Sequence, residues 1–270
     1  MDAAAPLVSV IMSVHNGEQW LNEAIESIIR QTYTHWEFII VDDASNKATQ
    51  DLLNHYRIDS RIKIIRVDSK QGLTKNLNTA IHLCNGEFIA RMDADDISMH
   101  DRLEKQVAWL QVNPHVSVIA SFIDIMDEKG KVVSVWPDDR KAITWQQIRV
   151  MLPWKNCIAH PSVMIRKKVL EQYRYNESQV HSQDWDLWLR LAAEGKIIEK
   201  IAIPLLLYRI HPASITSTSN RRSVFSKQHE FYQRYLKHSA FSRFNTKVRL
   251  GFIFNSIKLF LSRIKRKFIS

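Results

Sequence analysis

Four short apolar segments in the first hundred residues each end in polar side chains, and stretches with apolar residues at helical spacing separate them. The segments and the residues that follow are Leu7–Val14 before His15 and Asn16, Glu37–Val41 before Asp42 and Asp43, Ile62–Val67 before Asp68, and Phe88–Met92 before Asp93. Alternation of near-continuously apolar strands with helices is typical of a parallel sheet covered on both faces. We therefore predict an α/β fold with a mostly parallel sheet sandwiched by helices.

The fourth segment leads directly into three aspartates. Ligands of parallel sheets bind outside the carboxyl ends of the strands, and residues i and i+2 of an extended chain point to the same side. Asp93 and Asp95 can therefore face one target, and carboxylates held that close repel unless a positive charge lies between them. A hard divalent cation that also binds substrate phosphates fits this arrangement. The alternative is a solvated acidic turn that caps the helix expected from about Arg102 to Leu110.

Glycine-rich phosphate-binding loops are absent from the sequence. The chain has six glycines, and neither Gly-x-Gly-x-x-Gly after the first strand nor Gly-x-x-x-x-Gly-Lys occurs. A bound nucleotide would therefore need another way to neutralise its diphosphate. A cation held by Asp93 and Asp95 would serve that purpose.

The second half of the chain predicts a mixed arrangement of strands and helices. A hairpin-like turn at Asp127–Gly130 separates two β-rich segments, and there is no internal repeat or low-complexity linker. The expected elements are strands at Val116–Ile125, Val132–Trp136, Ser162–Ile165 and Leu205–Ile210, and helices at Trp145–Leu152 and Asp184–Ala193.

Positive charge is concentrated at the C-terminal end of the chain. The formal net charge is +10, and residues 221–270 contain 13 Lys and Arg residues but one acidic residue, Glu230. The rest of the chain is close to neutral. This asymmetry divides the chain into a globular part, residues 1–215, and a basic segment, residues 216–270, that meets an anionic partner such as a membrane surface or a nucleic acid.

The basic segment predicts an amphipathic helix. Its apolar positions are Ile253, Ile257, Phe260, Leu261, Ile264 and Phe268, and its basic positions include Lys258, Arg263, Lys265, Arg266 and Lys267. No uncharged run approaches the roughly 20 residues that span a bilayer. A basic helix with bulky apolar residues lies in a membrane interface, so we expect contact with an anionic membrane and none with nucleic acid. The alternative is that the stripe packs on the globular part.

The cysteines and the first residues bear on the compartment. Cys84 and Cys157 form neither a disulfide framework nor a metal-binding pattern, which suits a reducing cytosol. Residues Met1 to Pro6 contain no basic region and no long apolar run, so a cleaved signal peptide is not expected. Together with the basic segment, this predicts a cytoplasmic protein on the inner face of the cytoplasmic membrane.

The motifs as a set resemble those of bacterial family 2 glycosyltransferases, which are inverting enzymes with the GT-A (Rossmann-like) fold. The similarity covers about residues 6–215 and leaves out the basic segment. The matching segments are Val8–Glu18, Gln31–Tyr33, Phe38–Ser45, Gly72 with Asn78, Gly86–Asp96, Arg102–Gln106, His160–Met164, Asp184–Arg190, and Tyr208-Arg209 with His211.

The resemblance implies roles for individual residues and a requirement for Mn²⁺ or Mg²⁺. The metal would be held by Asp93, Asp95 and His211, with Asp96 in support, and Asp184 would be the catalytic base. The residues expected at the nucleotide are Val14, His15, Asn16, Glu18, Asp42, Asp43, Gly72, Asn78, Arg91, Asp93 and Ala94. The residues expected at the acceptor or the diphosphate are His160, Trp185 and Arg209.

For some of these residues a purely structural role is the alternative. Asp184 stands at a helix start and Asp42 before another helix, so either could be a helix cap. Trp185 could pack in the core, and His211 could be a surface residue.

The resemblance predicts transfer of a sugar from a nucleotide sugar, usually a UDP-sugar, to a saccharide or lipid-linked acceptor in cell-surface polysaccharide assembly. Several positions depart from the usual family pattern and leave the donor sugar unspecified: His15 for tyrosine, Ala44 for glycine, and Lys47 and Gln183 for acidic residues. Two other classes compete. A nucleotidyltransferase would normally carry a glycine-rich basic first loop, which Ser13–Gln19 lacks, and a non-enzymatic basic binding protein would not need the aspartates.

Overall fold

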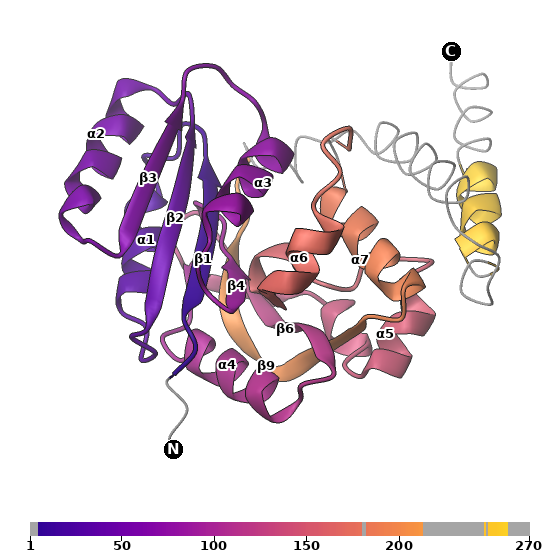
Figure 1. Ribbon diagram of the computed structural model, residues 1–270. Coiled ribbons are helices and arrows are strands. Elements are labelled where there is room, and N and C mark those ends of the chain that lie inside the picture. Colours follow the sequence, from indigo (N-terminus) through magenta and orange to yellow (C-terminus); the bar gives the residue numbers. More distant parts are fainter. Residues whose placement is uncertain (1–4, 180–181, 213–245, 247, 259–270) are drawn as a thin grey trace, which may run out of the picture.

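The computed structural model describes residues 5–179, 182–212, 246 and 248–258 (Figure 1). The described residues form one nine-stranded sheet in the order β3-β2-β1-β4-β8-β6-β9-β5, with β7 paired to β6. Helices lie on both sides of this sheet (Figure 1). The α/β fold predicted from the sequence is confirmed.

The N-terminal half is a parallel sheet built from the four predicted strands. Strands β1, β2, β3 and β4 are parallel to one another, and β1 lies between β2 and β4. Their connections are helical. The elements are β1 (Val8–Val14), α1 (Leu21–Ile29), β2 (Trp36–Asp43), α2 (Lys47–His55), the 3-10 turn η1 (Tyr56–Ile58), β3 (Ile62–Val67), α3 (Leu73–Leu83) and β4 (Phe88–Arg91).

The C-terminal half extends the sheet with strands of both directions. Strand β8 is antiparallel to both β4 and β6, whereas β6 and β9 are parallel. The elements are β5 (Ile97–Ser98), α4 (Arg102–Val112), β6 (Val116–Met126), β7 (Val132–Val135), η2 (Asp139–Lys141), α5 (Trp145–Met151), η3 (His160–Ser162), β8 (Met164–Arg166), α6 (Lys167–Tyr173), α7 (Gln183–Ala193) and β9 (Ile197–Arg209).

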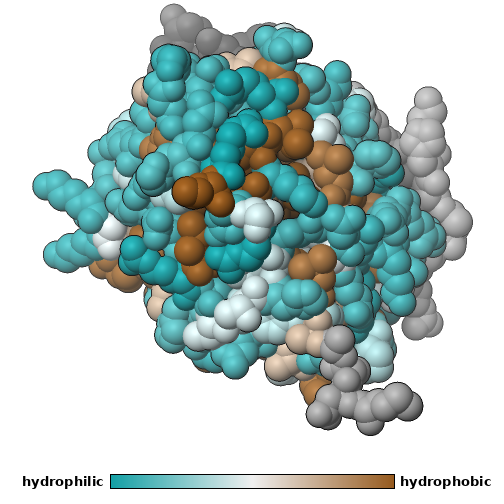
Figure 2. All heavy atoms as spheres, turned by 60° about the vertical axis from the view of Figure 1, so that its left-hand side comes forward, coloured by the Kyte–Doolittle hydropathy of each residue, from teal (hydrophilic) through white to brown (hydrophobic). Residues whose placement is uncertain are grey.

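Alternate residues of the central strands pack on opposite faces of the sheet, as the two-residue period of a strand requires. Ile39 and Val41 of β2 join one buried apolar cluster with residues of α3, α5, α6 and α7. Phe38 and Ile40 join a second cluster, with residues of α1 and α4. The face of the molecule on the side of α2 and β3 is mostly hydrophilic, with a smaller apolar patch near its centre (Figure 2).

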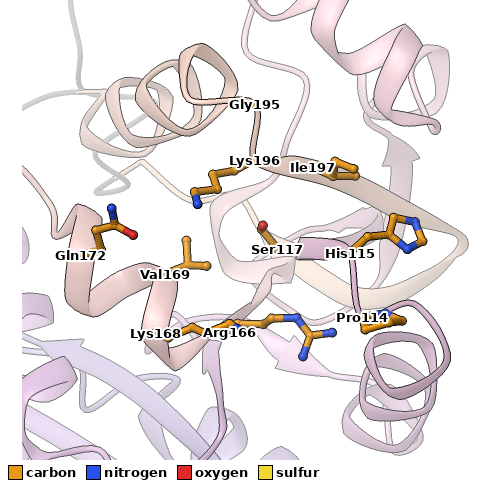
Figure 3. A pocket seen from close by; sticks show the side chains of 10 residues that line it. All are labelled: Pro114, His115, Ser117, Arg166, Lys168, Val169, Gln172, Gly195, Lys196 and Ile197. Carbon is orange, nitrogen blue, oxygen red and sulfur yellow. The ribbon is translucent and has the colours of Figure 1, made fainter.

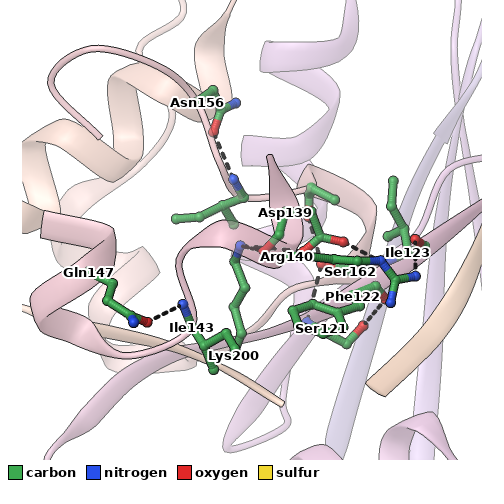
Figure 4. A network of polar contacts seen from close by, with 12 residues as sticks. Ser121, Phe122, Ile123, Asp139, Arg140, Ile143, Gln147, Asn156, Ser162 and Lys200 are labelled. Atoms are coloured by element: carbon green, nitrogen blue, oxygen red, sulfur yellow. Dashed lines mark hydrogen bonds and ion pairs between the residues drawn. The ribbon is translucent and has the colours of Figure 1, made fainter. Parts of the chain in front are cut away.

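Strand β9 begins eight residues before the predicted start at Leu205. Its first part contains Lys200, a residue type that usually marks solvent exposure, yet this side chain is fully buried. The Lys200 ammonium donates to the Asp139 carbonyl oxygen at 2.5 Å, and Asp139 accepts from the Ile123 N–H at 2.8 Å (Figure 4). Burial raises the pKa of Asp139 to about 6, although Lys200 opposes this shift. The buried pair ties β6 and β9 to the segment before α5.

Residues 248–258 of the basic segment are helical and contact the globular part. Val248 is fully buried in the same apolar cluster as α5 and α7, and Phe252 packs against it. The remainder of the predicted amphipathic helix lies outside the described residues. Within the described ranges, no helix is both long and apolar enough to cross a bilayer.

Candidate active site

The end of β4 brings three carboxylates together, here called the aspartate cluster: Asp93, Asp95 and Asp96. One oxygen from each lies within 4.8 Å of the others. Asp96 is buried, and its Oδ1 accepts the Arg209 backbone N–H at 2.9 Å. Its Oδ2 has no hydrogen-bond partner among the described residues. A buried oxygen without a partner is costly, so this geometry suits a bound cation.

The aspartate cluster carries more negative charge than the protein neutralises. Burial raises the pKa of Asp96 well above its usual value, and Asp93 and Asp95 add to the shift. Burial also raises the pKa of Asp93, against the opposing charge of Arg91. Carboxylates that resist ionisation in this way gain most from a divalent ion. The cluster therefore fits the predicted metal site in both donor chemistry and electrostatics.

Arg91 is the buried cation beside the cluster. Its guanidinium forms a two-point ion pair with Asp93. Burial alone would lower the pKa of Arg91, but Asp93 raises it, so the guanidinium stays charged. The β4 end is fixed in turn by Arg102, which donates to the carbonyl oxygens of Arg91 at 2.8 Å and Val163 at 3.2 Å.

His211 reaches the cluster from the end of β9. Its Nε2 lies 2.9 Å from Asp95 Oδ2. The imidazole also packs on the Trp20 ring, with 4.3 Å between the ring centroids. The structure therefore brings together all three predicted metal ligands, Asp93, Asp95 and His211, from two elements that lie more than a hundred residues apart in the chain.

Arg209 is buried and bound by protein atoms on every side. Its Nε donates to the Asp95 carbonyl oxygen at 2.8 Å, and its Nη2 donates to Glu23 at 2.6 Å. Its Nη1 donates to the carbonyl oxygens of Asp127 and Glu128 at 3.3 and 3.1 Å. The sequence predicts Arg209 at the acceptor or the diphosphate; in the structure this residue ties the turn after β6 to the aspartate cluster.

Asp184 lies in the first turn of α7. Ser182 occupies the helix-cap position, so Asp184 is not the cap. Asp184 Oδ2 accepts a hydrogen bond from Asn156 Nδ2 at 2.7 Å. The Asn156 oxygen accepts the Ile158 N–H at 3.1 Å, which fixes the amide with its NH₂ group toward Asp184 (Figure 4). Burial raises the pKa of Asp184, and the bond from Asn156 and the charge of Arg91 both oppose the rise.

His160 and Trp185 are both buried at α7: Trp185 follows Asp184 in the chain, and the His160 ring lies 6.1 Å from the ring of Trp188, centroid to centroid. His160 Nε2 lies 2.7 Å from the Tyr175 hydroxyl, and burial lowers the pKa of the imidazole well below its usual value. The Trp185 indole donates to the Leu152 carbonyl oxygen at 2.8 Å, and its ring is part of an apolar cluster. Trp185 thus packs in the core, as the alternative interpretation expects. His160 is a buried neutral side chain in contact with the Tyr175 hydroxyl.

All of the residues predicted at the nucleotide except Asn78 lie at or beside the ends of β1, β2 and β4. Asp42 accepts the Ser45 N–H and the Arg66 Nε–H, each at 3.0 Å. Asp43 accepts the N–H groups of Gln71 at 2.6 Å and Gly72 at 3.0 Å. Both carboxylates are buried and fully engaged. Gly72 has a φ of +89°, which only glycine adopts easily, so its amide can turn toward Asp43.

The loop after β1 is tied to the loop after β2. The Asn16 side chain accepts the Asn46 N–H at 2.8 Å, and His15 Nδ1 lies 2.8 Å from the Asp43 carbonyl oxygen. Glu18 accepts from Asn46 at 3.0 Å and from Thr49 at 2.7 Å. His15, Asn16 and Glu18 are exposed, so they can meet a ligand while the buried aspartates hold the loops.

Asn78 lies apart from these strand ends. It is buried in α3, where its amide donates to the Tyr175 carbonyl oxygen at 2.9 Å and accepts the Tyr175 N–H at 3.1 Å. Val14 is the last residue of β1 and is buried, and Ala94 packs against the apolar cluster under the aspartate loop. Asn78 therefore joins α3 to the segment after α6 and does not reach the nucleotide residues directly.

Sequence reasoning missed four residues that hold this site: Trp20, Arg66, Asn156 and Tyr175. Each acts through a partner far away in the chain, as Asn156 does with Asp184 28 residues later. Only Asn156 gave a local signal, because it stands four residues before the predicted His160.

A pocket of about 330 Å³ is lined by His115, Arg166, Lys168 and Lys196, among other residues (Figure 3). It lies where β6 and β9 begin and β8 ends. The strand registers place this edge of the sheet opposite the edge that carries the aspartate cluster. The pocket is therefore separate from the candidate active site.

Comparisons with known proteins agree with the motifs and the fold. A model of the family described as glycosyl transferase family 2 matches residues 9–174. The O-antigen biosynthesis glycosyltransferase WbnJ of Escherichia coli is 34% identical over 212 residues, which cover 77% of this chain and 81% of WbnJ. A second Escherichia coli protein, the UDP-Glc:alpha-D-GlcNAc-diphosphoundecaprenol beta-1,3-glucosyltransferase WfgD, is 30% identical over 78% of this chain and 80% of its own length.

The fold also matches that of a solved enzyme. The mannosyltransferase PcManGT of Pyrobaculum calidifontis, solved with GDP-Man and Mn²⁺, has a TM-score of 0.68 at 16% identity. The match covers 92% of this chain and 69% of that chain. Likeness at this identity shows the fold alone, which is the GT-A fold expected from the sequence. With the family model across more than half of the chain, and with WbnJ similar over most of both lengths, this chain belongs to glycosyl transferase family 2.

Proposed function

We propose that this protein is a metal-dependent inverting glycosyltransferase that transfers a sugar from a UDP-sugar to a saccharide or lipid-linked acceptor. The observation that carries the proposal is that the site contains two sets of carboxylates with different surroundings. The aspartate cluster lacks enough positive charge, whereas Asp184 is a separate buried carboxylate with a raised pKa and a hydrogen bond from Asn156, which suits proton transfer. Arg91 acts electrostatically on both sets.

Donor binding is assigned to the ends of β1 and β2. His15, Asn16 and Glu18 are exposed there, and Asp42 and Asp43 hold the loops that carry them. The base and ribose of the nucleotide would lie against this edge, in agreement with the general position of ligands on parallel sheets. The UDP-Glc in the name of WfgD supports a uridine nucleotide.

The diphosphate is assigned to the β4 end. Asp93, Asp95 and His211 would hold Mn²⁺ or Mg²⁺, with Asp96 in support, and the ion would neutralise the charge that develops on the departing diphosphate. The Mn²⁺ in the PcManGT structure supports a divalent ion in this fold. To hold the ion, Asp93 would give up part of its ion pair with Arg91, and the guanidinium would then be available to the phosphates.

Asp184 is assigned the role of base. In an inverting transfer the acceptor oxygen forms a bond to the anomeric carbon while the bond to the diphosphate breaks, and the acceptor hydroxyl loses its proton. A carboxylate with a raised pKa takes up that proton more readily than an ordinary one. The Asn156 amide donates to Oδ2 of Asp184 and so fixes the carboxylate that the acceptor hydroxyl would meet. His160, buried and neutral, is assigned to the acceptor side.

The acceptor is assigned to surface polysaccharide assembly at a membrane. WbnJ is named for O-antigen biosynthesis, and the acceptor in the name of WfgD is a diphosphoundecaprenol-linked sugar. A lipid-linked acceptor would place the enzyme on the inner face of the cytoplasmic membrane, in agreement with the charge of residues 216–270. Family membership does not support the nucleotidyltransferase or the non-enzymatic alternative.

A donor screen tests the proposal. Thermal stabilisation by UDP, GDP, CMP and dTDP sugars should be measured with and without Mn²⁺, since ligand binding to the folded state raises its stability. We expect stabilisation by a UDP-sugar that needs the metal, and loss of that dependence in Asp95→Ala. Stabilisation that is equal with and without metal would overturn the metal assignment. An α-configured product from an α-linked donor would overturn inversion.

A further inference from the structure

The helix at residues 248–258 has an apolar face that stays about half exposed among the described residues. Its inward positions, Val248, Gly251 and Asn255, are buried against the globular part. Its opposite positions are Leu250, Ile253, Phe254 and Ile257, and each of these side chains is about half exposed. They are spaced three or four residues apart, so they share one face. A helix that merely covered a domain would show polar residues on this outer face.

The apolar face continues onto the globular part through Trp154. This indole is 45% exposed and meets the Phe254 ring edge-on, with 6.4 Å between the centroids. Trp154 follows α5 directly, where Val150 is also exposed. The outward face of the helix and the Trp154 side chain are here called the apolar face. It spans two elements that are separated by nearly a hundred residues in the chain.

Basic side chains surround the apolar face. Lys258 places its ammonium 4.4 Å from the centre of the Phe254 ring, and Arg249 lies on the exposed flank of the same helix. Arg149 lies on α5, and Lys155, which follows that helix, forms an ion pair with Asp138. Neither residues 145–156 nor residues 246–258 contain an acidic residue. A protein partner of mixed charge would not select such a rim, whereas an anionic surface would.

We propose that the apolar face is a membrane-docking surface whose partner is the anionic headgroup layer of a lipid bilayer. Phe254, Ile257 and Trp154 enter the boundary between headgroups and acyl chains, and the surrounding lysines and arginines contact the lipid phosphates. Indole rings are favoured at this depth because they are apolar with one polar N–H group. This contact would give the globular part a fixed orientation on the membrane. Attraction of the basic segment by charge alone would not do so.

The inference deepens the proposed function, because it rests on a lipid-linked acceptor for its purpose, but it is tested separately. Binding of the full-length protein should be measured by co-sedimentation with vesicles of phosphatidylethanolamine and phosphatidylglycerol, and with vesicles of phosphatidylcholine alone. The test variant is Phe254→Ser with Ile257→Ser. The matched control is Ile58→Ser with Val112→Ser, since both residues are exposed apolar side chains on elements away from this helix (Figure 1).

We expect the wild type and the control to bind the anionic vesicles, and the test variant to bind at least about tenfold more weakly, because two apolar side chains lose their insertion. A second variant, Trp154→Phe, should remove much of the fluorescence quenching by brominated lipids. Equal binding by all variants, abolished by salt, would overturn the proposal and leave charge alone as the contact.

Two further measurements keep the outcomes distinct. Light scattering that shows a dimer in the wild type and a monomer in the test variant, without vesicle binding by either, would overturn the proposal in favour of a second copy of the chain. Metal-dependent stabilisation by a UDP-sugar should be the same in the test variant and the wild type. If the test variant loses vesicle binding but keeps donor binding, the result supports the membrane-docking surface. If neither protein responds to the donor, the proposed function is contradicted, whereas the docking surface is still judged by vesicle binding.

Discussion

The carboxylates at the end of β2 and those after β4 lie on the same edge of the sheet but have opposite surroundings. Asp42 and Asp43 are buried and accept from Ser45, Arg66, Gln71 and Gly72. In the aspartate cluster the carboxylates instead repel one another, and one oxygen of Asp96 has no partner among the described residues. The β2 end is complete without a ligand, whereas for the cluster we propose a cation from outside. Burial alone therefore does not identify a binding carboxylate; the supply of donors does.

Asp184 is a third case, and its removal should give the largest effect. Asp184→Asn keeps the shape of the side chain but cannot accept a proton. We expect sugar transfer to fall by roughly 10²–10⁴-fold, the usual contribution of a positioned base. Donor binding should persist, because the aspartate cluster is unchanged. Single-turnover transfer and nucleotide-induced stabilisation, measured side by side, check this. Near-normal turnover would remove Asp184 as the base.

Asp43→Asn should show that the β2 end is a structural element. The amide keeps one acceptor oxygen and loses the other, so one of the two N–H groups, from Gln71 or Gly72, is left without its charged partner. Hydrogen bonds to charged groups are worth about 1.5–3 kcal/mol, so a loss of that size in the free energy of unfolding is expected. Urea unfolding of the metal-free protein is the measurement. A variant as stable as the wild type would contradict the assignment.

Asn156 should affect the pKa of the base, Asp184, without taking up a proton itself. Its hydrogen bond to Asp184 opposes the rise of the pKa that burial causes. In Asn156→Ala the pKa of Asp184 should therefore rise further, and the acidic limb of the pH–rate profile should move to higher pH. On that acidic limb, where Asp184 is mostly protonated, we expect about a tenfold loss of rate for each unit by which its pKa rises, and no change on the plateau at higher pH. Asn156→Gln is the control, since its NH₂ group can still donate. A uniform loss of rate with an unmoved profile would indicate a purely structural role.

The strand ends were predictable because they follow from local pattern. Apolar runs of five to eight residues before Asp42 and Asp93 sufficed to place both groups on one edge, and His211 followed from the family motif. The partners were not predictable in this way. Tyr175 meets Asn78 across 97 residues, and Arg66 meets Asp42 from a neighbouring strand where its side chain looks like ordinary surface charge. The early start of β9 was not predictable for the same reason, since only the fold shows that Asp139 lies beside Lys200.

Glu37 extends the comparison to a fully paired carboxylate away from the site. It accepts from Ser9 at 2.7 Å, from Lys63 at 2.8 Å and from the Asn85 N–H at 2.5 Å. Burial opposes its ionisation, but these donors, Lys63 first, lower its pKa to about 2 from a usual value of 4.5. Glu37 therefore stabilises the fold fully above pH 4.5, and this contribution disappears as the pH falls toward 2. The unfolding free energy of Glu37→Gln should be lower than that of the wild type at pH 7, with a flatter loss below pH 4.5. Parallel acid dependence in the two proteins would contradict this.

The smallest effect, opposite in sign, is expected within the aspartate cluster. In Asp96→Asn the amide oxygen can still accept the Arg209 N–H, and a neutral NH₂ group replaces the oxygen that lacks a partner. Repulsion from Asp93 and Asp95 is reduced at the same time. We expect the metal-free variant to be as stable as the wild type or up to about 1 kcal/mol more stable at neutral pH, whereas Asp43→Asn is less stable. Unfolding in the presence of a chelator and then with Mn²⁺ separates the two effects: Mn²⁺ should stabilise the wild type more than Asp96→Asn. A strong destabilisation of metal-free Asp96→Asn would mean that the cluster, like the β2 end, is completed by the protein itself.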